Sequence, residues 1–136
     1  MTDGHFYVRE RGGRGEERFF ATALTRGPWS NDHQHGGPPT ALLARAIERL
    51  EHDGVDLFTV RMTVELLRPI PIAAPLEVVT EVLTRGRTVH RIAAALISGE
   101  QQLAVAVAVR IRVEELGLPI RLPDGHELLR PLEQCP

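Results

Sequence analysis

Residues 38–52 carry apolar side chains at helical spacing, and charged side chains fill the remaining sector of the helix. Pro38 and Pro39 suit a first helical turn, where missing N–H groups cost least, and Gly54 suits the position just after a helix end. The pattern therefore predicts one amphipathic helix of about four turns over residues 38–52.

The segments on both sides of this helix have the apolar content of β-strands. The predicted strands cover residues 5–9, 18–24, 57–67, 75–84, 87–97 and 102–112. Residues 84–87 and 98–101 are connections of hairpin length that contain a glycine, so the last three strands should form an antiparallel meander. The proline-rich residues 68–75 predict a bend at a sheet edge. One helix with an antiparallel sheet indicates the α+β class.

Neither face of the last predicted strand is polar. Along residues 103–109, Leu and Val point to one face and Ala to the other. A strand with one solvated face would alternate apolar and polar residues, so we expect cover on both faces: the helix on one, and another layer or a partner chain on the other. The alanine stripe would let that second layer approach closely. The alternative is an alanine stripe that stays partly exposed.

Composition narrows the class of protein without naming an activity. A chain of 136 residues, 43% hydrophobic and 25% charged, fits one domain. Its net charge of -2 gives no field that would attract nucleic acid. The only cysteine, Cys135, allows no intrachain disulfide and no cysteine-based metal site. No apolar run reaches the ~18 residues of a membrane span, so we expect a cytoplasmic protein with no nucleic-acid or membrane partner.

Residues 27–37, GPWSNDHQHGG, collect polar and aromatic side chains directly in front of the predicted helix. A helix N-terminus has unpaired N–H groups and a partial positive charge, so it attracts anions or the oxygen of a polarised carbonyl. Because proline has no N–H, the free donors must come from Gly36, Gly37 and Thr40. They could hold a thioester or ester oxygen as negative charge develops on it. The alternative is a tight turn into the helix without a ligand.

Asp32 and His35 are the candidates for a general base in this loop. The alternative for Asp32 is a hydrogen bond to its own loop backbone, and the alternative for His35 is a donor beside the helix start. His33 and His35 have a His-x-His spacing beside Asp32, but no fourth ligand stands out, and we predict no metal site.

Trp29 is expected to pack against one end of the helix or, as the alternative, to line an acyl or aromatic pocket. Serine-hydrolase, P-loop and dinucleotide-binding motifs are missing from the sequence, and we expect no cofactor.

The sequence also resembles a known family over roughly residues 18–112. The matching stretches are GPW, HGGPPTALLARAIE, VELLRPIPIAAPLEVVTEVLTRGRTV and AAALISGEQQLAVAVAVRIR, and the most specific element is LLRPIP followed by RGR. They resemble the N-terminal half of the double-hotdog acyl-CoA thioesterases, within the hotdog-fold thioesterase superfamily. The resemblance implies an antiparallel sheet wrapped around one long central helix. We expect a single hotdog domain over residues 1–113 and a tail or linker over residues 114–136.

The resemblance further implies that two hotdogs pair side by side, as a homodimer or homotetramer, with an acyl-CoA pocket near the helix N-terminus. The implied activity is hydrolysis of an acyl thioester, with catalytic roles for Asp32, His35, Gly36 and Gly37 and substrate contacts from Trp29, His33 and Thr40. Related single-hotdog enzymes carry a catalytic carboxylate where this chain has Ala44, and in double-hotdog relatives the carboxylate lies in the C-terminal half. The base must then come from Asp32, His33, His35 or a second polypeptide. The alternative is a non-catalytic acyl-CoA-binding or oligomerisation module.

Overall fold

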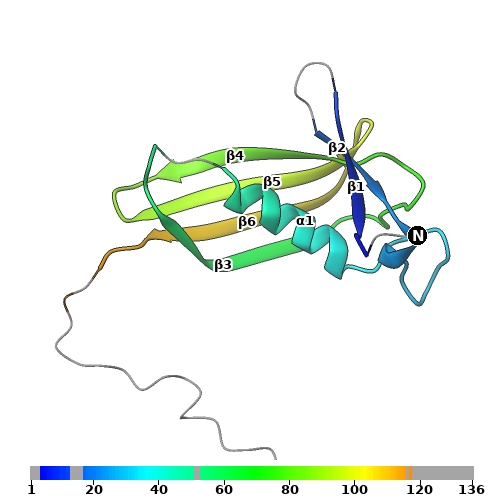
Figure 1. The fold of residues 1–136 in the computed structure, drawn as a ribbon, viewed down its shortest axis with the longest axis horizontal. Coiled ribbons are helices and arrows are strands. Elements are labelled where there is room, and N and C mark those ends of the chain that lie inside the picture. Colours follow the sequence, from blue (N-terminus) through cyan, green and yellow to red (C-terminus); the bar gives the residue numbers. More distant parts are fainter. Residues whose placement is uncertain (1–3, 13–16, 51–52, 116, 118–136) are drawn as a thin grey trace, which may run out of the picture.

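The computed structural model describes residues 4–12, 17–50, 53–115 and 117. Its elements along the chain (Figure 1) are β1 (Tyr7–Arg11), β2 (Glu17–Ala21), the 3₁₀ turn η1 (Ala23–Thr25), α1 (Gly37–Glu48), β3 (Leu57–Leu66), β4 (Glu77–Arg85), β5 (Val89–Ser98) and β6 (Gln101–Arg112). The predicted helix and strands are therefore confirmed in kind and order. Most of the predicted tail over residues 114–136 lies outside the described residues.

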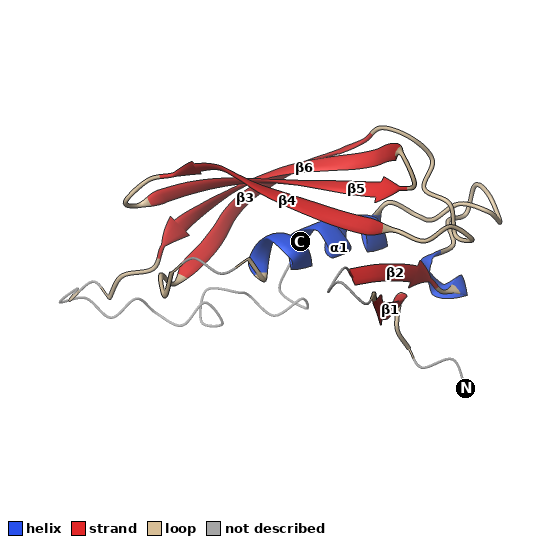
Figure 2. Ribbon diagram, turned by 90° about the horizontal axis from the view of Figure 1, so that it is seen from above, coloured by secondary structure: helices blue, strands red, loops and turns tan. Residues whose placement is uncertain are grey.

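The larger sheet has the strand order β3-β6-β5-β4, and every neighbouring pair is antiparallel. The predicted meander β4-β5-β6 is therefore confirmed, and β3 joins it beside β6 at the edge of the sheet. Figure 2 shows α1, β1 and β2 on the same side of this sheet, so the layers are one sheet and one helix with a small hairpin. Paired backbone hydrogen bonds between Phe19 and Leu76 connect β2 to the segment just before β4.

Two predicted elements end earlier in the structure than in the sequence analysis. The second strand stops at Ala21 because the Thr22 hydroxyl accepts a hydrogen bond from the Leu24 N–H and starts the turn η1. The helix ends at Glu48, where Arg49 still donates its N–H to the Arg45 carbonyl. Residues 51–52 of the predicted helix lie outside the described residues.

The alanine stripe of β6 faces the helix. Ala104, Ala106 and Ala108 are at most 1% exposed and belong to the same core cluster as Leu43 and Ile47 of α1. Small side chains on the sheet let the helix approach closely, and the larger helix residues fill the space between them. The sequence alone did not decide which stripe of this strand meets the helix; in the structure α1 covers the alanine stripe.

The valine stripe of β6 lies on the opposite face. Val105, Val107 and Val109 are half-buried by their neighbours on the sheet, and Val79 on β4 is 54% exposed. No element of the described ranges lies over this face (Figure 2). Cover by a partner chain, as predicted from the strand pattern, thus concerns the valine face and stays a prediction.

Arg110 ends the alanine face, and it is 6% exposed. Its guanidinium donates one hydrogen bond to the Ile47 carbonyl, 3.1 Å away, and another to the Leu57 carbonyl, 2.9 Å away. One side chain on β6 thus satisfies backbone oxygens at the end of α1 and at the start of β3.

None of the described helices is long and apolar enough to cross a membrane.

Candidate functional site

The loop that leads into α1 is fixed by backbone hydrogen bonds on both of its sides. On one side it runs beside residues 70–72, with bonds from the Gln34 N–H to the Ile70 carbonyl and from the Ile72 N–H to the Asp32 carbonyl. On the other side the His35 N–H donates to the carbonyl of Thr25, a fully buried residue, at 2.8 Å. The proline-rich segment after β3 thus positions the start of the helix, which explains why the two segments occur in one site.

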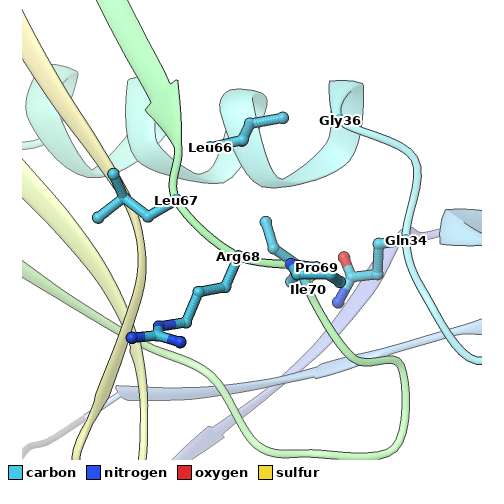
Figure 3. A pocket seen from close by; sticks show the side chains of 7 residues that line it. All are labelled: Gln34, Gly36, Leu66, Leu67, Arg68, Pro69 and Ile70. Atoms are coloured by element: carbon cyan, nitrogen blue, oxygen red, sulfur yellow. The ribbon is translucent and has the colours of Figure 1, made fainter.

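A cavity of about 290 Å³ lies between this loop and the end of β3. It is lined by Gln34, Gly36, Leu66, Leu67, Arg68, Pro69 and Ile70. Figure 3 shows the Leu66 side chain pointing toward Gly36, while Arg68 extends away from Gly36 on the other side of Pro69 and Ile70. The cavity therefore has mostly apolar walls, with Gly36 at one end and the Arg68 side chain at the other.

Gly36 precedes the first residue of α1 and has φ −65° and ψ −21°. Its N–H donates to no other group in the part of the chain that the structure describes. A Cβ at this position would lie 3.0 Å from Leu66 Cδ1, so a side chain would project into the cavity. A free amide at a helix N-terminus is suited to hold a carbonyl oxygen that gains negative charge.

The Gly37 amide, by contrast, already has a partner. It donates to Nδ1 of His35 at 2.9 Å, and a Cβ at position 37 would lie only 2.7 Å from Cε1 of the same ring. The prediction of two uncapped glycine amides is therefore wrong for Gly37. Because Nδ1 accepts this bond, the neutral ring carries its proton on Nε2. Neither nitrogen of such a ring is free to take a proton from water unless this bond breaks, so the general-base hypothesis for His35 requires the ring to move.

Thr40 is bonded to the backbone of its own helical turn. Its N–H and its hydroxyl both donate to the Gly36 carbonyl, at 3.2 Å and 2.8 Å. The prediction that its amide is a further free donor is therefore wrong. The hydroxyl bond instead keeps the Gly36 peptide in place.

The other predicted site residues lie outside the cavity lining. Asp32 is exposed, and its carboxylate has no hydrogen-bond or ion-pair partner among the residues that the structure describes. His33 is half-buried, and its Nδ1 lies 2.9 Å from the Ser30 hydroxyl. Trp29 is 86% exposed, so the prediction that it packs against the helix end is wrong. Within residues 4–12, 17–50, 53–115 and 117, no group of three potential ligand residues is arranged to hold a metal ion.

Gln34 is a site residue that the sequence analysis missed. It accepts a 2.7 Å hydrogen bond from the Tyr7 hydroxyl, and its Nε2 donates to the Pro71 carbonyl at 2.8 Å. Burial raises the pKa of Tyr7 above its ordinary value, so the hydroxyl stays a donor. The position of Gln34 between two histidines was a sequence signal for a site residue. Its hydrogen bond, however, depends on Tyr7, which is distant in the sequence. The sequence analysis did single out the LLRPIP residues that line the cavity, but only as a family motif and not as cavity residues.

Residues 25–112 match the sequence family described as the acyl-CoA thioesterase N-terminal domain. This match covers more than half of the chain and includes the loop, α1 and the whole larger sheet. The chain belongs to the acyl-CoA thioesterase N-terminal domain family. Among curated protein sequences, none matches this chain.

Solved structures agree with this acyl-CoA thioesterase domain in fold. A Streptococcus mutans protein bound to acetyl-CoA is 15% identical, with a TM-score of 0.66 over 83% of this chain and 91% of its own. The E. coli PaaI protein from the phenylacetic acid degradation operon is 17% identical, with a TM-score of 0.65 over 72% of this chain and 71% of its own. A Bacillus halodurans protein solved with CoA is 16% identical, with a TM-score of 0.63 over 80% of this chain and 75% of its own. The predicted α+β hotdog fold is confirmed.

Proposed function

We propose that this domain binds acyl-CoA or another acyl thioester in the cavity at the start of α1 and hydrolyses it. The observation that supports the proposal is the unbonded amide of Gly36, a residue that lines a cavity with mostly apolar walls at a helix N-terminus. In this arrangement the Gly36 N–H holds the thioester carbonyl and stabilises the negative charge that water attack places on its oxygen. The Streptococcus mutans and Bacillus halodurans structures were solved with acetyl-CoA and CoA, which is consistent with this ligand class.

The remaining cavity residues suit the two parts of such a ligand. Leu66, Leu67 and Ile70 offer apolar contacts to an acyl chain. Arg68 lines the same cavity and forms no ion pair within the described ranges, so its guanidinium is available for the phosphates of CoA. We therefore propose that the apolar walls contact the acyl group and that Arg68 contacts the CoA part of the ligand.

Asp32 is our assignment for the group that activates water. Its carboxylate is exposed and unpartnered in the described part of the chain, whereas Nδ1 of His35 is engaged by Gly37. A carboxylate without a competing cation remains available to accept a proton. Since Asp32 lies outside the cavity lining of this single chain, a group from a second polypeptide is the other source of the base.

A non-catalytic acyl-CoA-binding module is the second candidate. One observation favours it: the lining of the cavity includes neither a carboxylate nor an imidazole. Ala44, where related enzymes have their carboxylate, is a half-buried position on α1. Such a module would hold the thioester through the same Gly36 amide without cleaving it.

Thiol release from acyl-CoAs of different chain lengths separates the two candidates. If the domain is an enzyme, we expect turnover by the wild type and an about 100-fold or larger loss of kcat in Asp32→Asn, with analogue binding preserved. Asp56→Asn is the matched control, because Asp56 is also exposed and uses only its backbone carbonyl, which accepts from Val113. Binding of acyl-CoA without thiol release by the wild type would instead support the module.

We further propose that the domain is a homodimer or part of a homotetramer, in which the free edge of β3 pairs with β3 of a second copy. β3 is the edge strand next to β6, and it exposes Phe58, Val60 and Leu66 by 63%, 48% and 53%. An exposed edge of this kind readily pairs with another strand. Because Leu66 also lines the cavity, such a partner would lie beside the site and could complete it. Sedimentation at micromolar concentration is expected to give at least the dimer mass, and a monomer throughout would contradict the proposal.

A further inference from the structure

The contact between His35 and Gly37 has a chemical property that a simple helix cap lacks. The Gly37 N–H donates to Nδ1 of an imidazole at 2.9 Å, and Nδ1 accepts only while the ring is neutral. When the ring gains a proton, both of its nitrogens become donors, and Nδ1 then faces the Gly37 N–H donor-to-donor. Protonation of the ring therefore breaks this hydrogen bond.

Only the ring of His35 has freedom to respond. Its backbone N–H is bonded to the Thr25 carbonyl at 2.8 Å, and a Cβ at Gly27 would lie 3.3 Å from the His35 backbone nitrogen. The backbone is thus held against the loop, whereas His35 as a whole is exposed. The ring packs over Gly37, where any side chain would collide with it. A change in the ring's charge is therefore expected to move the ring and leave the backbone in place.

The segments around the ring contain charged groups of both signs. The titratable and charged groups in the segments around it are Arg26 beyond η1, Asp32 and His33 in its own loop, and Arg68 on the cavity wall. None of them forms an ion pair with His35 in the described part of the structure.

We propose that His35 is a proton-controlled latch on the Gly37 amide and so a positioning residue for the ligand. In its neutral state the ring occupies this amide. In its protonated state it releases the amide and becomes a donor beside it, so that a ligand oxygen meets donors from Gly36, Gly37 and the ring together. This inference rests on the proposed function, because it needs a ligand oxygen at Gly36, and it adds a dependence on pH that the single free amide does not have.

The sign of that dependence follows from linkage. A ligand oxygen that binds better when the ring is protonated and the Gly37 amide is free favours protonation of the ring. Falling pH therefore strengthens binding, and bound ligand makes the ring take up its proton at higher pH. A general-base role gives the opposite trend, because a base acts when it is unprotonated and the rate then rises with pH. A pH profile therefore separates a latch from a base.

The test uses a ketone analogue of hexanoyl-CoA, in which a methylene replaces sulfur, and measures its Kd by calorimetry between about pH 5.5 and 8. For the wild type we expect affinity to rise about fivefold or more as the pH falls, the factor that one hydrogen bond contributes. His35→Ala leaves the Gly37 amide free at every pH but lacks the ring as a donor. At pH 8 it should therefore bind more tightly than the neutral wild type and less tightly than the protonated wild type, with no ring-dependent change. His35→Asn keeps an acceptor near the position of Nδ1 at every pH, so it should bind weakly throughout.

His5→Ala is the control, since the His5 contact within the described residues is made by its backbone carbonyl, and it should keep the wild-type profile. Ionisation of the ligand is common to all variants and cancels in the comparison. Should His35→Ala fail to fold, the NMR titration of the His35 ring in the wild type replaces it, and its midpoint is expected to move to higher pH with saturating analogue. Identical pH profiles in all variants, or an unmoved midpoint, would overturn the latch alone. No binding of the analogue by any variant would contradict the proposed function and the latch with it.

Discussion

Gly36→Pro is expected to lower kcat for thioester hydrolysis about 100- to 1000-fold, the effect of removing one donor from an oxyanion site. Proline removes the N–H, and its ring fixes φ near the value of −65° that Gly36 already has. The substitution therefore deletes the donor without forcing a new φ at this residue. Steady-state thiol release from a medium-chain acyl-CoA measures the loss.

Gly36→Ala is the matched control for this variant. Alanine keeps the N–H and adds a Cβ 3.0 Å from Leu66 Cδ1, a contact that a small rotation of the leucine side chain relieves. We expect it to keep most of the wild-type kcat and to weaken binding of the analogue modestly. Thermal unfolding of both variants establishes that the domain is intact. Equal rates for Gly36→Pro and Gly36→Ala would mean that the amide is not used.

Arg110→Ala is expected to lower the free energy of unfolding by about 2–4 kcal/mol. The arginine is 6% exposed, and its two hydrogen bonds satisfy the carbonyls of Ile47 and Leu57. Truncation leaves both oxygens without this donor and removes the packed alkyl chain. Urea unfolding at one fixed protein concentration measures the change.

Arg91→Ala provides the comparison for Arg110. Arg91 lies on the neighbouring strand β5, is exposed and forms no ion pair in the described residues, so its loss should change stability by less than about 0.5 kcal/mol. Arg110→Met keeps most of the side-chain volume and should still destabilise the domain, because it restores neither hydrogen bond. If Arg110→Ala matched Arg91→Ala, the link between α1 and β3 would contribute nothing to stability.

The fold was predictable because its periodicities are strong, while the orientation of β6 was not. An apolar repeat over residues 38–52 and a run of strands with short glycine-containing turns specify one helix and an antiparallel meander. In β6, however, valines and alanines make both faces apolar, so no polar face indicates which one meets solvent. The close approach of α1 to Ala104, Ala106 and Ala108 decides the orientation, and that packing is a tertiary property.

The site was predictable in its location and only partly in its hydrogen bonds. Two glycines before two prolines mark a helix N-terminus with accessible backbone, but the partner of each amide depends on side-chain rotamers that the pattern does not encode. The sequence pattern therefore did not indicate that the His35 ring accepts a hydrogen bond from the Gly37 amide. Trp29 was misplaced for a related reason: aromatic side chains usually find cover, and the 86% exposure of this one follows from the path of the loop.

The central claim is that the Gly36 amide receives the carbonyl oxygen of an acyl thioester. NMR of protein labelled with ¹⁵N-glycine tests it most directly, because each described glycine reports separately during titration with the ketone analogue of hexanoyl-CoA. We expect the Gly36 amide proton to move strongly downfield, as a new hydrogen bond to oxygen forms, while Gly4 and Gly99, around which a Cβ would meet no neighbour, stay in place. A saturable calorimetric binding signal with an unmoved Gly36 resonance would contradict the account.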